Sequence, residues 1–290
     1  MFNADSGHNN GFDSSLVECL VEFKTTPDQD PFVQHIGGEL NPAITGQESF
    51  MRTSSNARKV AGQITAYATL ILSAQYCTHV FLVLILKDYS RLICWDRGGA
   101  VATEPIIHND EPHLPEFLIR FKDACRQARG CDITVSLPTK DEELEARKLK
   151  ELADVTSLLS LSISAPFQPS KPNRYIICAP CSRPDIPAGR WTWISIAYDV
   201  QRRKRVLLKD SWWVSLQDTT PEGQIYEILH RHGVCHIPLC TQAGDIGNDH
   251  YHASRTHEFN NSYFFSSRCA SSPLSLSAGH YWPTTSCLQR

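Results

Sequence analysis

The chain has 290 residues, which allows two domains of ordinary size, and its 41% hydrophobic and 20% charged residues are typical of globular proteins. A net charge of −3 gives no strong indication that the chain binds nucleic acid. No apolar leader follows Met1, and the longest apolar run, residues 80–86, is too short to cross a bilayer, so we expect no membrane association. The eleven cysteines are scattered and odd in number, which favours reduced thiols in an intracellular protein, in the cytoplasm or the nucleus.

The first half of the chain predicts a mixed α/β amino-terminal module over residues 16–160, after a polar start, residues 1–15, that we expect to be disordered. Alternation of apolar and polar residues predicts strands, and apolar residues three and four positions apart predict helices. A capping box, with Thr139 at the N-cap and Glu142 three positions on, marks the start of a third helix. The expected elements are a strand at 16–24, a helix at 57–76, a three-strand meander over 79–104, and helices at 111–129 and from 139.

The second half predicts a linker at residues 161–173, a smaller domain at 174–258 and a disordered serine-rich tail at 259–290. The tail has few apolar residues that could offset the entropy lost on ordering. In the smaller domain the expected elements are strands at 174–178, 191–200 and 205–209, followed by a helix at 221–232 with proline in its first turn.

Lys209 and Glu222 form the most informative pair of residues. Lys209 ends an apolar strand, and Glu222 opens an amphipathic helix thirteen residues later. Protein kinases hold ATP with a lysine on a strand and pair that lysine with a glutamate on the next helix. The ammonium then acts as a point charge against the α- and β-phosphates. The alternative interpretation is a lysine at an exposed strand end.

Together with other segments, this pair gives the chain a resemblance to the fungal-type protein kinase family over about residues 16–258. The resemblance implies an α+β fold, in which an amino-terminal region precedes a protein-kinase-like small lobe of five strands and a helix. It also implies ATP and Mg²⁺ as cofactors and phosphoryl transfer to protein Ser/Thr. By this match Lys209 is the ATP lysine, Glu222 the helix glutamate and Gly189 the remnant of the phosphate loop. The segments that carry it are Gly62–Ala68 (GQITAYA), Thr78–Phe81 (THVF), Arg91–Ala100 (RLICWDRGGA), Leu208–Trp212 (LKDSW) and Glu222–Tyr226 (EGQIY).

Three features depart from the family. Only Gly189 remains of the glycine-rich loop, where residues 188–193 read AGRWTW, and Trp213 stands where the family more often has Arg. No His-Arg-Asp or Asp-Phe-Gly motif follows Glu222, and the sequence becomes rich in serine soon after His257. We therefore expect a chain truncated before the catalytic loop and inactive alone, either by a gene-model error or as a genuine short form. The alternative is a non-catalytic pseudokinase fragment that regulates or binds a protein whose identity the sequence does not indicate.

The amino-terminal module offers a second chemistry, that of a restriction-endonuclease-like nuclease. Glu22 and Lys24 are two apart on a strand and share a face, while Gln63 lies on the next helix and Asp13 precedes both. Nucleases of this class use an Asp, a Glu-x-Lys and often a helical Gln, and their carboxylates hold Mg²⁺. A chance Glu-x-Lys on an exposed strand is the alternative. Elsewhere, Cys178 and Cys181 lack a second nearby pair, so we predict no metal site there.

Overall fold

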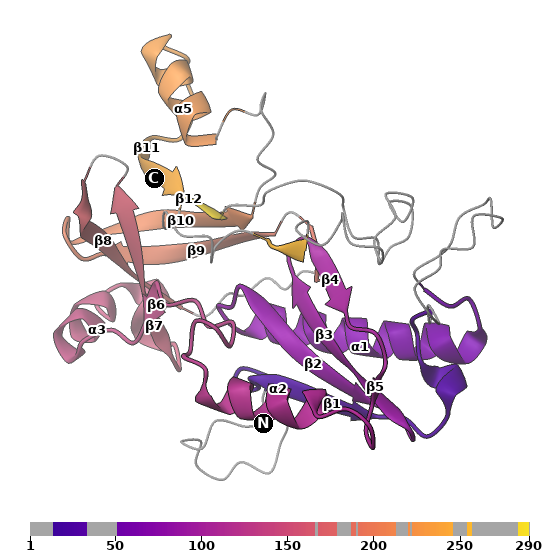
Figure 1. Cartoon of the computed structure of the whole chain (residues 1–290). Coiled ribbons are helices and arrows are strands. Elements are labelled where there is room, and N and C mark those ends of the chain that lie inside the picture. Colours follow the sequence, from indigo (N-terminus) through magenta and orange to yellow (C-terminus); the bar gives the residue numbers. More distant parts are fainter. Residues whose placement is uncertain are drawn as a thin grey trace. The chain divides into compact units, whose positions relative to one another are not determined.

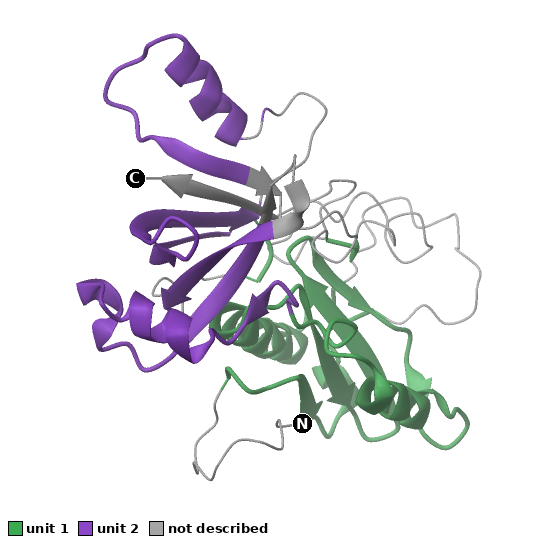
Figure 2. Cartoon of the chain, turned by 90° about the vertical axis from the view of Figure 1, so that its left-hand side faces the viewer, with its two compact units in different colours: residues 1–131, 185–189, 254–280 green, residues 132–184, 190–253, 281–290 purple. Residues whose placement is uncertain are grey.

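The structure is a computed structural model, and it describes residues 14–33, 51–165, 168–178, 187–189, 191–212, 220, 222–245, 254–256 and 284–289. Within these residues the chain is a mixed α+β protein with five α-helices and two mostly antiparallel sheets (Figure 1). It divides into two compact units (Figure 2). Unit 1 holds residues 1–131, 185–189 and 254–280, and unit 2 holds residues 132–184, 190–253 and 281–290.

Unit 1 is built on a five-stranded sheet in the order β1-β2-β3-β4, with β5 also paired to β3. Only β1 and β2 run parallel, and the predicted strand and three-strand meander are both confirmed. The turn from β3 to β4 is tight, and the Asp96 carboxylate caps it by accepting hydrogen bonds from two backbone N–H groups. The strands are β1 (Cys19–Phe23), β2 (His79–Ile85), β3 (Tyr89–Asp96), β4 (Gly99–Ala102) and β5 (Ile106–Ile107).

Two helices contact opposite faces of this sheet. α1 (Ser55–Ala74) begins where the Ser54 side chain accepts a hydrogen bond from the Ala57 N–H, and its buried residues recur at helical spacing, as predicted. α2 (His113–Asp123) packs its aromatic side chains on the other face, in a cluster with Cys19 of β1. The prediction of this helix to residue 129 was too long, because the chain becomes extended after Asp123 and then turns.

Unit 2 is built on a seven-stranded antiparallel sheet in the order β11-β12-β10-β9-β8-β7-β6. Alternate side chains of its strands, Leu158, Ile176 and Tyr198 among them, are buried against the helical segment at residues 140–153. The predicted capping box of Thr139 and Glu142 is confirmed. The elements are β6 (Val135–Ser136), α3 (Lys140–Ala146), α4 (Lys150–Ala153), β7 (Leu158–Ala165), β8 (Gln168–Cys178), β9 (Thr192–Asp199), β10 (Lys204–Trp212), α5 (Glu222–Arg231), β11 (Cys240–Asp245) and β12 (Thr284–Gln289).

Two expectations differ from this architecture. Residues 161–173, expected to form a linker, belong mostly to the hairpin of β7 and β8. The register shifts between Ile163 and Ala165, and such an irregular ladder tolerates the prolines of this stretch, which have no N–H to donate. Residues 284–289, expected to be disordered, form β12 between β10 and β11, because backbone pairing does not require apolar side chains. The rest of the serine-rich tail from 259, like residues 1–13, lies outside the described residues.

No helix in the described ranges is long and apolar enough to span a membrane.

Candidate functional sites

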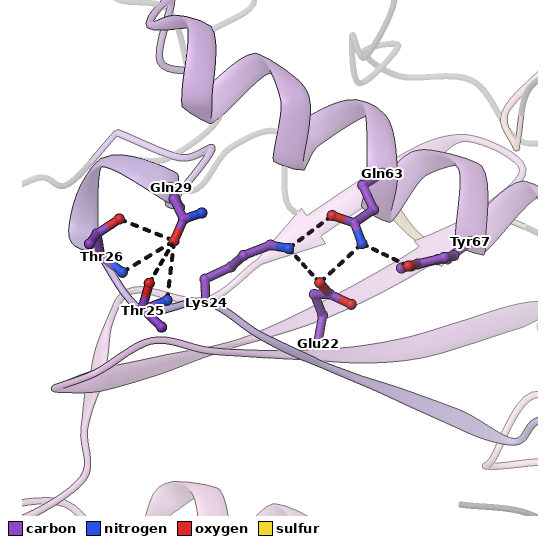
Figure 3. Close-up of polar contacts among 7 residues, drawn as sticks. All are labelled: Glu22, Lys24, Thr25, Thr26, Gln29, Gln63 and Tyr67. Carbon is purple, nitrogen blue, oxygen red and sulfur yellow. Dashed lines mark hydrogen bonds and ion pairs between the residues drawn. The ribbon is translucent and has the colours of Figure 1, made fainter.

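Glu22, Lys24, Gln63 and Tyr67 form one connected polar network in unit 1 (Figure 3). The Lys24 ammonium donates to Glu22 Oε1 at 2.5 Å and to Gln63 Oε1 at 2.9 Å. The Gln63 amide nitrogen donates to the same Glu22 oxygen at 3.1 Å and to the Tyr67 hydroxyl at 2.7 Å. Glu22, Lys24 and Gln63, which the sequence assigns to one nuclease-like site, therefore lie together.

Strand and helix periodicity explain why these four side chains meet. Glu22 and Lys24 alternate with Phe23, so they point toward α1 while Phe23 points to the other face, where it is 69% exposed. Gln63 and Tyr67 are four residues apart and lie on one side of α1. The Glu22 and Lys24 side chains are only 16% and 14% exposed, so the network lies near the surface without being fully open to water.

A buried ion pair fixes the loop that follows Lys24. Asp30 is fully buried and accepts from Arg91 Nε at 2.8 Å, from the Tyr89 hydroxyl at 2.9 Å and from the Phe32 N–H at 3.0 Å. Burial, and next the negative charge of Asp30, raise the pKa of Tyr89 to about 12. Sequence reasoning missed this cluster, although Arg91 inside an apolar strand is a signal for a buried partner charge.

Among the described residues, the network contains one carboxylate, that of Glu22. Asp13, the expected third member, lies outside the described residues. Over the described ranges, no group of three His, Cys, Asp or Glu residues could hold a metal ion. What the network offers chemically is one carboxylate oriented by an ammonium and an amide.

In unit 2 the expected pairing of Lys209 and Glu222 is confirmed. The Lys209 ammonium lies 2.5 Å from both carboxylate oxygens of Glu222, and the two side chains are 19% and 26% exposed. Lys209 projects from β10, and Glu222 is the first residue of α5. The carboxylate therefore holds the ammonium at a partly open position on the sheet.

The position of α5 depends on a close approach that the sequence analysis did not identify. None of the helix residues is fully buried, so few contacts hold α5 on the sheet. Beside Glu222, a Cβ atom added to Gly223 would collide with the Cβ of Ala243 in β11. Gly223 thus allows the first turn of α5, and with it Glu222, to lie against β11.

Gly189, expected in a phosphate-binding loop, belongs to unit 1. It has a φ of 115°, a conformation that glycine adopts readily, and its N–H donates to the Arg97 carbonyl at 2.8 Å. Most of the surrounding loop, residues 179–186 and 190, lies outside the described residues.

Comparisons of the chain with protein-family models, with curated proteins and with solved structures give no match. The arrangement of helices and strands in the described residues defines the class of the chain, a mixed α+β protein with two mostly antiparallel sheets.

Proposed function

We propose that unit 2 is a protein-kinase-like small lobe that binds the phosphates of ATP through Lys209. The observation that carries this proposal is the pair of 2.5 Å contacts between the Lys209 ammonium and both Glu222 oxygens. A lysine on a strand, oriented by the first glutamate of the following helix, is the arrangement that protein kinases use to hold α- and β-phosphates. The resemblance to the fungal-type protein kinase family supports the same assignment.

In this proposal Glu222 positions the ammonium and Lys209 supplies the charge that meets the phosphates. The exposure of Lys209, 19%, leaves room for a phosphate oxygen to approach it. Mg²⁺ would arrive with the nucleotide, since Mg²⁺ is commonly held by substrate phosphates with only one or two carboxylates. The printed sequence after Glu222 contains no His-Arg-Asp or Asp-Phe-Gly motif, so we propose nucleotide binding with a regulatory role rather than phosphoryl transfer by these 290 residues.

A calorimetric titration of the full chain with Mg-ATP tests this proposal. Lys209→Met should weaken binding by about 10-fold or more, because a hydrogen bond to a charged group contributes about 1.5–3 kcal/mol. Lys148→Met is the matched control, since Lys148 also pairs with a glutamate, Glu145, at 2.5 Å but on the exposed surface of unit 2. Equal binding by the two variants, or no binding by the unaltered chain, would refute the proposal.

A second candidate, a Mg²⁺-dependent nuclease in unit 1, is favoured by the Glu22–Lys24–Gln63 network alone (Figure 3). Plasmid nicking in the presence of Mg²⁺ tests it, with Glu22→Gln expected to abolish cleavage. Glu18→Gln is the matched control, because Glu18 lies just before the same strand and pairs with Arg129 at 2.8 Å. Absence of nicking by the unaltered chain, or nicking that survives Glu22→Gln, removes this candidate.

A further inference from the structure

Two cysteines of unit 1 face each other across a short antiparallel bridge. Cys77 follows α1 and precedes β2, while Cys131 follows the turn at Gly130, and the structure pairs the two residues directly. Gly130 has a φ of 102°, and a Cβ atom there would collide with the His79 carbonyl, so the glycine allows the two segments to approach closely.

The hydrogen bond beside the bridge defines its type. The Thr78 N–H donates to the Gly130 carbonyl at 2.9 Å, so the bond joins the residues flanking the cysteines. Cys77 and Cys131 are thus a non-hydrogen-bonded pair, the arrangement in which Cα atoms lie about 4.5 Å apart and side chains share one face. A disulfide needs Cα atoms about 4.4–6.8 Å apart, so the backbone already meets this requirement.

Burial makes two other thiols of unit 1, those of Cys19 and Cys94, less reactive. Burial raises the pKa of the Cys19 thiol to about 11, and burial also raises the pKa of the Cys94 thiol. Thiols of this kind stay protonated and react slowly, because the thiolate is the nucleophile. Cys131 is only half-buried, whereas Cys77 is 9% exposed. An oxidant can therefore reach Cys131 first, with Cys77 beside it to complete the reaction.

We propose that Cys77 and Cys131 form a reversible disulfide, a redox modification site, when the chain meets a low-molecular-weight disulfide such as glutathione disulfide. The Cys131 thiolate attacks one sulfur of glutathione disulfide and releases one glutathione thiolate. Cys77 then attacks the mixed disulfide at the Cys131 sulfur and releases the second glutathione. The two protein thiols lose two electrons and two protons, which the oxidant takes up to become two molecules of glutathione.

The modification links Cys77, which lies just before β2, to Cys131, the last residue of unit 1 before the chain enters unit 2. A cross-link that closes residues 77–131 restricts the unfolded chain and stabilises unit 1. The proposal is independent of nucleotide or nuclease function.

The test oxidises the full chain with excess glutathione disulfide, blocks remaining thiols and maps the linked peptides by mass spectrometry. The unaltered chain should yield a Cys77–Cys131 peptide that reduced glutathione reverses, and its melting temperature should rise by roughly 5–15 °C. Cys131→Ser should give neither result. Cys125→Ser should behave like the unaltered chain, since Cys125 is exposed and lies outside the bridge.

Peptide mapping of the unaltered chain decides the proposal even where a serine variant fails to fold. A stable glutathione adduct on Cys131, a link from Cys131 to another cysteine, or unchanged thiols at both positions would each overturn it.

Discussion

Asp96 and Thr256 are 160 residues apart in the sequence, yet the Asp96 carboxylate accepts hydrogen bonds from both the N–H and the hydroxyl of Thr256, each at 3.0 Å. The same carboxylate accepts from the N–H groups of Arg255 at 2.7 Å, Gly98 at 2.7 Å and Gly99 at 3.1 Å. One buried side chain therefore closes the β3–β4 turn and attaches the segment 254–256 to unit 1.

Asp96→Asn should destabilise unit 1 by about 2–4 kcal/mol, because an amide nitrogen would face donors that now share a carboxylate oxygen. Urea unfolding followed by fluorescence measures the change. Asp88→Asn, at an exposed position in the β2–β3 turn, should change the free energy of unfolding by less than about 0.5 kcal/mol. Equal effects of the two substitutions would contradict the role assigned to Asp96.

Gly98→Ala should detach the segment 254–256 without altering any hydrogen-bonding side chain. A Cβ atom at Gly98 would collide with the hydroxyl oxygens of Ser254 and Thr256. We expect a loss of about 1–3 kcal/mol in the free energy of unfolding and faster proteolysis beside Arg255.

The matched control for this substitution is Gly62→Ala on α1, where an added Cβ atom meets nothing within 4 Å. That variant should gain up to about 1 kcal/mol, because alanine is a better helix former than glycine. Similar losses in both variants would show that the effect does not come from the 254–256 contact.

Sequence periodicity was enough to place the first strand, the meander and α1, because each is a local pattern with its own turn or cap. The same periodicity placed Glu22, Lys24 and Gln63 on facing surfaces. The contact of Asp96 with Thr256 was not predictable, since no local pattern connects residues so far apart. β12 was not predictable either, because it is held by backbone pairing, which serine-rich composition does not indicate.

Burial of His79 predicts a pH dependence for the stability of unit 1. Burial lowers the pKa of His79, while the backbone carbonyl of Ala128 and the charge of Asp96 partly oppose that shift and Arg255 adds to it. The unfolded chain titrates near the ordinary value of about 6.5, so between the two pKa values it binds more protons than the folded chain. The contribution of His79 to the free energy of unfolding should therefore be fully present above the unfolded pKa of about 6.5, and it should fall as the pH falls toward the lower pKa of the folded chain.

Urea unfolding between pH 7.5 and 5 measures this dependence. His79→Gln should flatten the loss of stability over this range, because glutamine does not titrate. His113→Gln, on the exposed start of α2, should leave the profile of the unaltered chain in place. An identical slope in the His79 variant would show that other groups cause the pH dependence.

Gly223→Ala should weaken nucleotide binding although it leaves Lys209 and Glu222 in the sequence. The added Cβ atom would collide with the Ala243 Cβ in β11, so the first turn of α5 must move away from the sheet. Since the carboxylate of Glu222 holds the Lys209 ammonium from that turn, the ion pair should lengthen. We expect the affinity for Mg-ATP to fall about 3- to 10-fold, less than in Lys209→Met, because the charge itself remains.

The double variant Gly223→Ala/Ala243→Gly separates this mechanism from general damage to unit 2. It exchanges the two side chains across the contact, so the collision disappears and the total volume stays the same. Calorimetry should find affinity restored to within about 2-fold of the unaltered chain, even if glycine in β11 costs some stability. Failure of the exchange to restore affinity, in a protein that remains folded, would mean that the position of α5 does not control Lys209.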